Sequence, residues 1–545
     1  MNVTYTQLAR KYFNYLARCF PVMCASDEFH FIPRAQKAAE YYHRLDDFDV
    51  AAIDECINRL KAFCQEFNRL RTSETDLEKI IDLELLSANA KGIAIELEQN
   101  RVWCHNPLLY LKIVFIGIDH ALNKPADHPK ERQERILERM SSIPGLLNQA
   151  ASNLDRVPES YYHSAKAMLK DGMQYLSQTA KAYLASGDKS LLPCLQDTAA
   201  ALKDFENFFN SVHPVPDEHC SSTSLASSLK DHFSSIRELN EVFQIAVDEW
   251  QDTLERLKDI QRKIDPDTSW QKLYHGFYPN IKETDTFSLY RFEIDRLRKF
   301  FSRRGFKKED LDSPLEIAPT PMYLKSIRSS ASFAAAFSSD SREKSFFYIT
   351  TNFDGKEKVL KNNSRLKKRL HREYKFLTAH ETIPGHHLLD SMRRRLANPI
   401  RRQIESPLFY EGWAYYVESL LAGEDYIKDL MEYLVDYKRR LWRSARCQID
   451  VGLPTGLITK KDAVELLTTS GFSSKEAARQ IHRFQLNPGY QLCYSLGRYE
   501  IMRLKKAYGA GMGSEAFHAF LLEGGELPFH WIEKRLQVIS KPFRE

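Results

Sequence analysis

The sequence has few cysteines, and their spacing excludes two common kinds of site. Its nine cysteines are scattered and odd in number, with no C-x-x-C pair. A disulfide framework or a cysteine-based structural zinc site would need paired cysteines at short spacing. We therefore expect reduced thiols and a cytoplasmic location.

The chain also lacks long apolar runs and a strong net charge. No stretch reaches the roughly 18 consecutive apolar residues of a transmembrane helix, and residues 1–32 contain no apolar signal core. The 78 Lys and Arg nearly balance the 73 Asp and Glu, so the net charge of +5 creates no general attraction to nucleic acid or to a membrane surface. We expect neither as a partner.

Helix-period apolar residues dominate what the sequence does contain. Of its 545 residues, 43% are apolar and 28% are charged, which is the balance of a compact globular protein. Apolar residues recur three and four positions apart in much of the chain, as in residues 53–64 and 83–97. A β-branched and aromatic run at residues 346–351 is our best candidate for a strand. We predict a mainly α-helical protein with a small β-sheet, divided into residues 1–265, a helical scaffold, and residues 266–545.

The strongest chemical signal is the histidine-rich segment His380-Glu381-Thr382-Ile383-Pro384-Gly385-His386-His387. In the common H-E-x-x-H pattern, two histidines four residues apart bind one zinc ion from one face of a helix. Here Pro384 stands where the second histidine would be. On an undistorted helix His386 would lie roughly 240° around the axis from His380, and His387 about 10.5 Å along it. Neither would then share an ion with His380.

A break in the helix would solve this spacing problem. Proline inside a helix costs about 3 kcal/mol and glycine about 1 kcal/mol relative to alanine, so we expect Pro384-Gly385 to interrupt the helix. Such an interruption can swing the next histidine back toward His380. We predict His380 and His386 as metal ligands. His387 is then a catalytic or substrate-contacting residue, and it remains the alternative second ligand.

Glu411 is the predicted third ligand. A catalytic zinc ion usually has three protein ligands and an open position for water. Glu411 begins a helical segment 25 residues after His386, which is enough chain for one helix turnaround. Glu418 lies two helical turns further on the same face. It would orient a metal ligand through a contact on the side of that ligand away from the metal. The C-terminal unit would then be catalytic, with the small sheet beside the metal-binding helix.

The same segment supplies candidates for catalysis. Glu381 would be the general base that takes a proton from water activated by the metal and passes it to the leaving amine. Tyr494, and after it Arg498, are candidates for stabilising the oxyanion and for substrate binding. Tyr490 and Tyr348 are further candidate substrate-binding residues, the latter because its strand could bind the substrate main chain along an edge.

Three motifs contain the candidate metal ligands together with Glu381 and Tyr494. They are residues 380–387, the segment Glu411-Gly412-Trp413-Ala414-Tyr415-Tyr416, and Pro488-Gly489 with Tyr494 and Gly497. With residues 517–528, they resemble the bacterial zincin-like family known as domain of unknown function 885, whose hallmarks are H-E-G-x-P-G-H-H and E-G-W-A-x-Y. The resemblance implies a gluzincin-like helical fold with a long cleft, similar to the thimet oligopeptidase and carboxypeptidase Taq groups, and metallohydrolase activity. Thr382 departs from the family's glycine, and Gln491 stands one place from the family's usual glutamine.

Three functions fit these residues. The first is a Zn²⁺ metallopeptidase that cleaves peptides or small oligopeptides. The second is a zinc amidohydrolase that acts on a modified amino acid or another non-peptide amide. The third is a non-catalytic helical scaffold in which the zinc ion is four-coordinate and closed to water.

Basic residues cluster on both sides of the histidine segment, within residues 361–372, 393–402 and 438–446. They could recognise a substrate carboxylate, but long cations more often cover a solvated helix face. No recognised nucleic-acid-binding module accompanies them. We expect a solvated face.

Overall fold

The computed structural model describes residues 4–187, 189–218, 220–281, 285–337, 340, 342–350 and 360–540. The helices up to residue 264 are α1 (Tyr5–Cys19), α2 (Val50–Ser73), α3 (Leu77–Ala94), α4 (Val102–His105), α5 (Pro107–Asn123), α6 (Pro129–Ser141), α7 (Ile143–Asn153), α8 (Glu159–Ser186), α9 (Leu192–Ser211), α10 (Ser222–Ser227) and α11 (Leu239–Ile264).

The helices from residue 270 onward are α12 (Trp270–Gly276), α13 (Thr286–Phe301), α14 (Lys308–Leu311), α15 (Leu360–Arg372), α16 (Tyr374–Glu381), α17 (His386–Arg395), α18 (Pro407–Gly423), α19 (Leu430–Thr455), α20 (Lys460–Thr469), α21 (Ser474–Phe484), α22 (Leu492–Leu504), α23 (Ala510–Met512), α24 (Ser514–Glu523) and α25 (Phe529–Ser540). The strands are β1 (Glu316–Pro319), β2 (Ala331–Ala334) and β3 (Phe346–Ile349). The prediction of a mainly helical protein with a small sheet is confirmed.

Capping residues explain where the two longest helices near the site begin and end. The Ser406 side chain caps α18, whose first residue is Pro407, a residue with no N–H group to leave unsatisfied. Asp429 accepts a hydrogen bond from the backbone N–H of Met431 at the start of α19. α19 ends at Gly456, whose φ of 73° lies in the left-handed region that glycine adopts without strain. These local signals set the lengths of the helices that carry the site.

The three strands form one small sheet in the order β1-β3-β2. β3 pairs in parallel with β1 and antiparallel with β2, where Phe347 lies opposite Phe333. The predicted strand at residues 346–351 is observed over Phe346–Ile349, and Thr351 lies outside the described residues. We predicted that this strand has a free edge. That prediction is wrong, because β3 is the middle strand and both its edges are paired.

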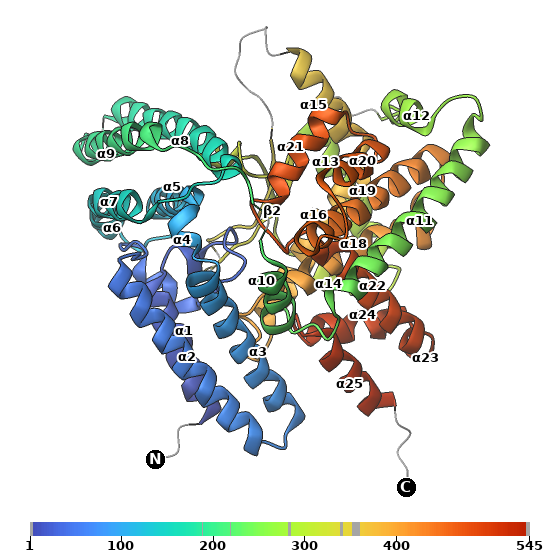
Figure 1. Ribbon diagram of the computed structural model, residues 1–545, viewed down its shortest axis with the longest axis horizontal. Coiled ribbons are helices and arrows are strands. Elements are labelled where there is room, and N and C mark those ends of the chain that lie inside the picture. The colour runs from blue at the N-terminus through green and yellow to red at the C-terminus, as the bar shows by residue number, and fades with distance from the viewer. Residues whose placement is uncertain are drawn as a thin grey trace.

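Two groups of helices meet across a shared hydrophobic core. Figure 1 shows α1–α9 on one side and α11–α25 on the other, with α10 between them. The larger core cluster draws on buried residues from Leu8 to Leu536. A buried ion pair also joins the groups, with Arg401 Nε 2.7 Å from Asp82 Oδ1. The division near residue 265 stays a prediction. No helix in the described ranges combines the length and apolar character needed to cross a bilayer.

Candidate metal centre

The histidine segment is split between two helices. α16 ends at Glu381 and α17 begins at His386, with a cis peptide bond before Pro384 in the turn between them. A Cβ atom on Gly385 would lie 1.9 Å from the carbonyl oxygen of His380, so the turn requires glycine. The helix interruption predicted from Pro384-Gly385 is therefore observed.

The turn brings His386 back to His380, and Glu411 joins them from α18. The two imidazole centroids lie 4.7 Å apart. Glu411 Oε2 lies 3.4 Å from Nε2 of His380 and 3.6 Å from Nε2 of His386. All three side chains are buried, and one ligand atom from each lies within 4.8 Å of the others. The structure thus groups the three residues that we predicted as metal ligands.

The arrangement fits a zinc ion. Ligand atoms about 2.0–2.1 Å from zinc in a tetrahedron lie about 3.3–3.4 Å from one another, close to the two contacts of Glu411. Glu411 Oε2 is buried and forms no hydrogen bond of ordinary geometry with any described residue, although buried acceptors normally have a partner. Two imidazoles and a carboxylate are a donor set that holds catalytic zinc. His380, His386 and Glu411 are therefore able to hold Zn²⁺.

The charges of the centre reinforce one another. Burial lowers the pKa of His380, but its contacts with Glu411 and Glu418 outweigh burial and raise that pKa to about 9. Burial raises the pKa of Glu411, but His380 and His386 outweigh burial and hold that pKa well below its usual range. Glu411 is therefore a carboxylate, which is the form that binds a cation.

Glu418 contacts Nδ1 of the His380 ring, and Glu411 contacts Nε2 of the same ring. Glu418 Oε1 lies 2.8 Å from Nδ1 of His380, which leaves Nε2 directed at Glu411. Arg439 of α19 donates to Glu418 through Nε and Nη2, at 3.0 Å each. Arg443, one turn further along α19, donates through Nη1 at 3.0 Å. Glu418 thus lies behind a candidate ligand, where the sequence predicted it.

Tyr490 and Tyr494 form hydrogen bonds with Oε1, the second carboxylate oxygen of Glu411. Their hydroxyls donate to Oε1 at 2.6 and 2.8 Å, so Oε2 is the oxygen left facing the histidines. Burial and the Glu411 carboxylate raise the pKa of both tyrosines, so both hydroxyls keep their protons. The structure brings both predicted residues to the centre.

Glu381 is the last residue of α16, and its side chain reaches the edge of the sheet. Its Oε2 accepts a hydrogen bond of 2.8 Å from the backbone N–H of Phe333 in β2. A strand edge does therefore approach the centre, but it belongs to β2 and not to β3. Unlike the buried ligand candidates, Glu381 is partly exposed.

Three predicted residues lie away from this cluster. His387 is buried with Nε2 3.1 Å from the carbonyl oxygen of Pro314, and burial lowers its pKa to about 4. Arg498 pairs with Glu249 of α11 at 3.1 Å, on the side of α22 that faces α11. Tyr348 belongs to the middle strand β3. None of these contacts supports a catalytic or substrate-binding role for the three residues.

The basic residues near the histidine segment are only in part a solvated face, since Lys367, Lys368 and Arg395 are exposed and others are not. Arg393, Lys438, Arg439 and Arg443 are buried, and burial lowers the pKa of Lys438 to about 7. The side chains of residues 360–365 lie outside the described residues. For the buried cations of α19 our expectation fails because α19 packs against both α11 and α22, so these cations must pair with carboxylates. Arg439 and Arg443 are positioning residues that we missed, because their burial depends on this packing between distant helices.

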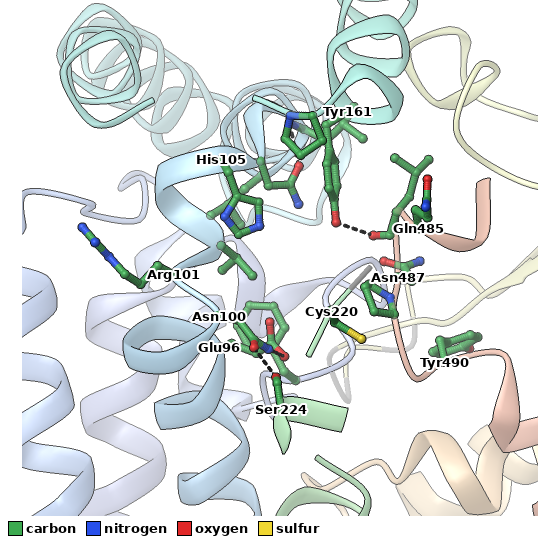
Figure 2. Close-up of a pocket in the computed structure, with 18 of the residues that line it drawn as sticks. Glu96, Asn100, Arg101, His105, Tyr161, Cys220, Ser224, Gln485, Asn487 and Tyr490 are labelled. Carbon is green, nitrogen blue, oxygen red and sulfur yellow. Dashed lines mark hydrogen bonds between the residues drawn. The ribbon is translucent and has the colours of Figure 1, made fainter. Parts of the chain in front are cut away.

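A cavity of about 600 Å³ has Tyr490 in its lining, whereas His380, Glu381, His386 and Glu411 are not among its lining residues. Its lining comes from both groups of helices and includes His30 and Tyr490, whose rings lie 4.4 Å apart. Figure 2 shows Tyr490 on one wall and Glu96 on another. The Tyr490 hydroxyl donates to Glu411, so one residue of the cavity wall also contacts the ligand cluster. Its volume lies within the range of small-molecule sites.

Comparisons with known proteins identify a family and a fold. A family described as bacterial proteins of unknown function (DUF885) matches residues 33–536. Two solved structures, each described as a "putative lipoprotein", align over 99% of this chain. The one from Shewanella oneidensis has 17% identity, a TM-score of 0.76 and 100% of its own length covered. The one from Colwellia psychrerythraea has 15% identity, a TM-score of 0.74 and 99% covered. At these identities the likeness shows a shared fold. No curated protein matches the chain.

Proposed function

Because this chain belongs to the DUF885 family of bacterial proteins of unknown function, its activity must be argued from its own residues, and we propose that it is a zinc-dependent hydrolase of peptide bonds. The observation that carries the proposal is the geometry at Glu411, where one buried oxygen faces two imidazole nitrogens at 3.4 and 3.6 Å. A carboxylate, Glu381, directly follows the first histidine, and Tyr490, which contacts Glu411, also lines a cavity in the size range of small-molecule sites.

The ligand candidates and the general base have separate roles in this proposal. His380, His386 and Glu411 hold the zinc ion, which when bound supplies a Lewis acid that polarises the scissile carbonyl and acidifies water. Glu381 takes a proton from the attacking water and delivers it to the leaving amine. The hydrogen bond from the Phe333 N–H holds one oxygen of Glu381, so the other is the oxygen that handles the proton.

Three further predicted residues, Glu418, Tyr490 and Tyr494, position the ligands. Glu418 keeps Nε2 of His380 directed at the cluster, and Tyr490 keeps Oε1 of Glu411 occupied. Tyr494 shares that second task and remains our candidate donor to the oxyanion. In that role its hydroxyl would exchange Glu411 for the substrate oxygen.

Glu381→Gln is the variant that tests this function. It retains all three ligand candidates, so we expect full zinc content and turnover lowered by roughly 10²- to 10⁴-fold, the usual size of a general acid–base contribution. The measurement is mass-spectrometric detection of cleavage by zinc-loaded protein, with and without a chelator, of a peptide library and of a set of non-peptide amides. The exposed Glu465→Gln on α20 is the matched control and should match wild type.

Three outcomes of that measurement separate the alternatives. Chelator-sensitive peptide cleavage that Glu381→Gln abolishes supports the proposal. Cleavage of non-peptide amides without peptide cleavage would favour the amidohydrolase. No turnover of either class by zinc-loaded wild type would contradict both and favour the scaffold.

The cellular compartment is a separate part of the proposal. We retain the cytoplasm, because the nine cysteines of this chain are scattered and free. The lipoprotein description of the two solved neighbours argues for the opposite location. Fractionation of cells that express the full-length protein tests this, and recovery with the membrane fraction would overturn the cytoplasmic location.

A further inference from the structure

Glu96 is an acidic side chain in the cavity wall that pairs with no cation in the part of the chain that the structure describes. Among the described residues, no Lys, Arg or His forms an ion pair with it, and its one hydrogen bond comes from Asn100 Nδ2, 2.9 Å from Oε1. Burial raises the pKa of Glu96 to about 7, and the Asn100 hydrogen bond offsets only part of that shift. No described residue donates to Oε2, so this oxygen can accept a hydrogen bond from a group that enters the cavity.

The backbone around Glu96 is shaped to present this side chain. α3 passes into a π-helical turn over Ile95–Gln99, a distortion that is frequent at functional sites. Arg101 then adopts a φ of 46°, in the left-handed region that non-glycine residues seldom occupy. Ser224 donates to Oδ1 of Asn100, which turns the amide nitrogen of Asn100 toward Glu96 (Figure 2). The three side chains thus form a chain of donors that ends at the carboxylate.

The Lys and Arg side chains that line the same cavity do not form ion pairs with Glu96. Lys112 lies 3.2 Å from Glu28. Arg156 is exposed and lies 3.7 Å from the equally exposed Glu218. Arg101 points away from the other labelled side chains in Figure 2. The charge of Glu96 therefore remains unmatched within the described part of the chain.

We propose that Glu96 binds an ammonium or guanidinium group of the substrate in this cavity. A partly buried carboxylate has lost hydration, and a cation that donates a charge-assisted hydrogen bond restores that loss. The group is either the N-terminal α-ammonium of a peptide or the side chain of a lysine or arginine within it. That the ligand is a peptide substrate rests on the function proposed above.

Peptide binding to a variant that cannot turn over its substrate tests the proposed cation site directly. The probes are hexapeptides with Lys, norleucine or Glu at each position in turn, each with a free and with an acetylated N-terminus. Their dissociation constants are measured by calorimetry on zinc-loaded Glu381→Gln. We expect the best cationic peptide to bind roughly tenfold more tightly than its norleucine counterpart, a typical gain from one charge-assisted hydrogen bond.

The variant Glu96→Gln, combined with Glu381→Gln, should reduce this preference to less than about twofold, because the amide keeps the shape but loses the charge. Glu98→Gln is the matched control, since Glu98 is exposed on the same π-helical turn and pairs with Lys61. A preference that acetylation removes identifies the α-ammonium, and one that follows internal lysine identifies the side chain.

Several results would overturn the inference. The first is a wild-type pocket with no preference for cations at any position. The second is a preference that survives Glu96→Gln. The third is a marked loss of stability in Glu96→Gln, since an unmatched carboxylate should be replaceable without such a loss.

Failure of the proposed function would look different. Preferential binding of cationic peptides without turnover by zinc-loaded wild type would overturn the peptidase and leave the cation site in place. Peptide turnover by zinc-loaded wild type without a preference for cationic peptides would overturn the cation site and leave the peptidase in place.

Discussion

A chain of buried polar side chains runs from Tyr274 to His380. The Tyr274 hydroxyl donates to Glu373, and Arg439 bridges Glu373 and Glu418. Glu418 in turn contacts His380 Nδ1. Each charged member has partners of opposite sign, which is the condition under which buried ions are tolerated. The orientation of the His380 ring is therefore set by the protein before any metal binds.

The two adjacent histidines should differ in their effect on metal binding. We expect His386→Ala to lower zinc affinity by at least roughly 100-fold, because even residues behind a ligand contribute 10- to 100-fold. His387→Ala should keep its zinc, because Nε2 of His387 faces the carbonyl oxygen of Pro314. Zinc per chain, measured by elemental analysis after dialysis, checks both. Full zinc in His386→Ala would show that the cluster is not the metal site.

At the scale of the elements, α18 connects the ligand cluster to two neighbours. A Cβ atom on Gly412 would lie 2.5 Å from Gly497 Cα, so α18 and α22 meet backbone to backbone. Trp413 Nε1 donates to the carbonyl oxygen of Pro384 at 2.9 Å, which ties α18 to the turn between α16 and α17. These contacts give a physical reason for glycine and tryptophan directly after Glu411.

The close contact between α18 and α22 predicts a difference between two glycines of one helix. Gly412→Ala should lower the free energy of unfolding by roughly 1–3 kcal/mol, because an added methyl group has no space at this crossing. Gly423→Ala has nothing within 4 Å of the added atom and should be neutral or stabilise by up to about 1 kcal/mol. Urea unfolding measures both. Equal effects would mean that the helices do not meet at these glycines.

At the scale of the whole molecule, Glu28 joins the N-terminal segment to the region before β2. It pairs with Arg328 and with Lys112, the latter at 3.2 Å. Burial raises the pKa of Glu28, but the two cations outweigh burial and lower that pKa to about 2. Because the folded-state pKa lies below the ordinary value of 4.5, this stabilisation is present above about pH 4.5 and is lost as the pH falls toward 2.

Glu28→Gln should therefore have an effect that depends on pH. At pH 7 we expect a loss of roughly 3 kcal/mol in the free energy of unfolding, because the pKa of Glu28 falls from 4.5 to about 2 on folding. At pH 3 the difference from wild type should be clearly smaller. Glu98→Gln, at an exposed ion pair, should change stability by less than about 1 kcal/mol at either pH. A loss that is the same at both pH values would contradict the lowered pKa.

Local rules determined much of this protein from the sequence alone. The helical class follows from the 3.6-residue period of apolar side chains, which does not depend on what the helices pack against. The interruption at Pro384-Gly385 follows from the cost of both residues inside a helix. His380, His386 and Glu411 were predicted together because a catalytic zinc site needs three ligands, although that they bind metal remains a prediction.

Tertiary structure alone decided the rest, because those features depend on contacts between distant segments. The order of the strands made β3 the middle strand, and no period within one strand reports its neighbours. The packing of α19 against α11 and α22 buried Arg439 and Arg443, which the sequence predicted to be solvated. Glu96 has no cationic partner in the described ranges because of how the cavity wall assembles, and its own segment carries no sign of this.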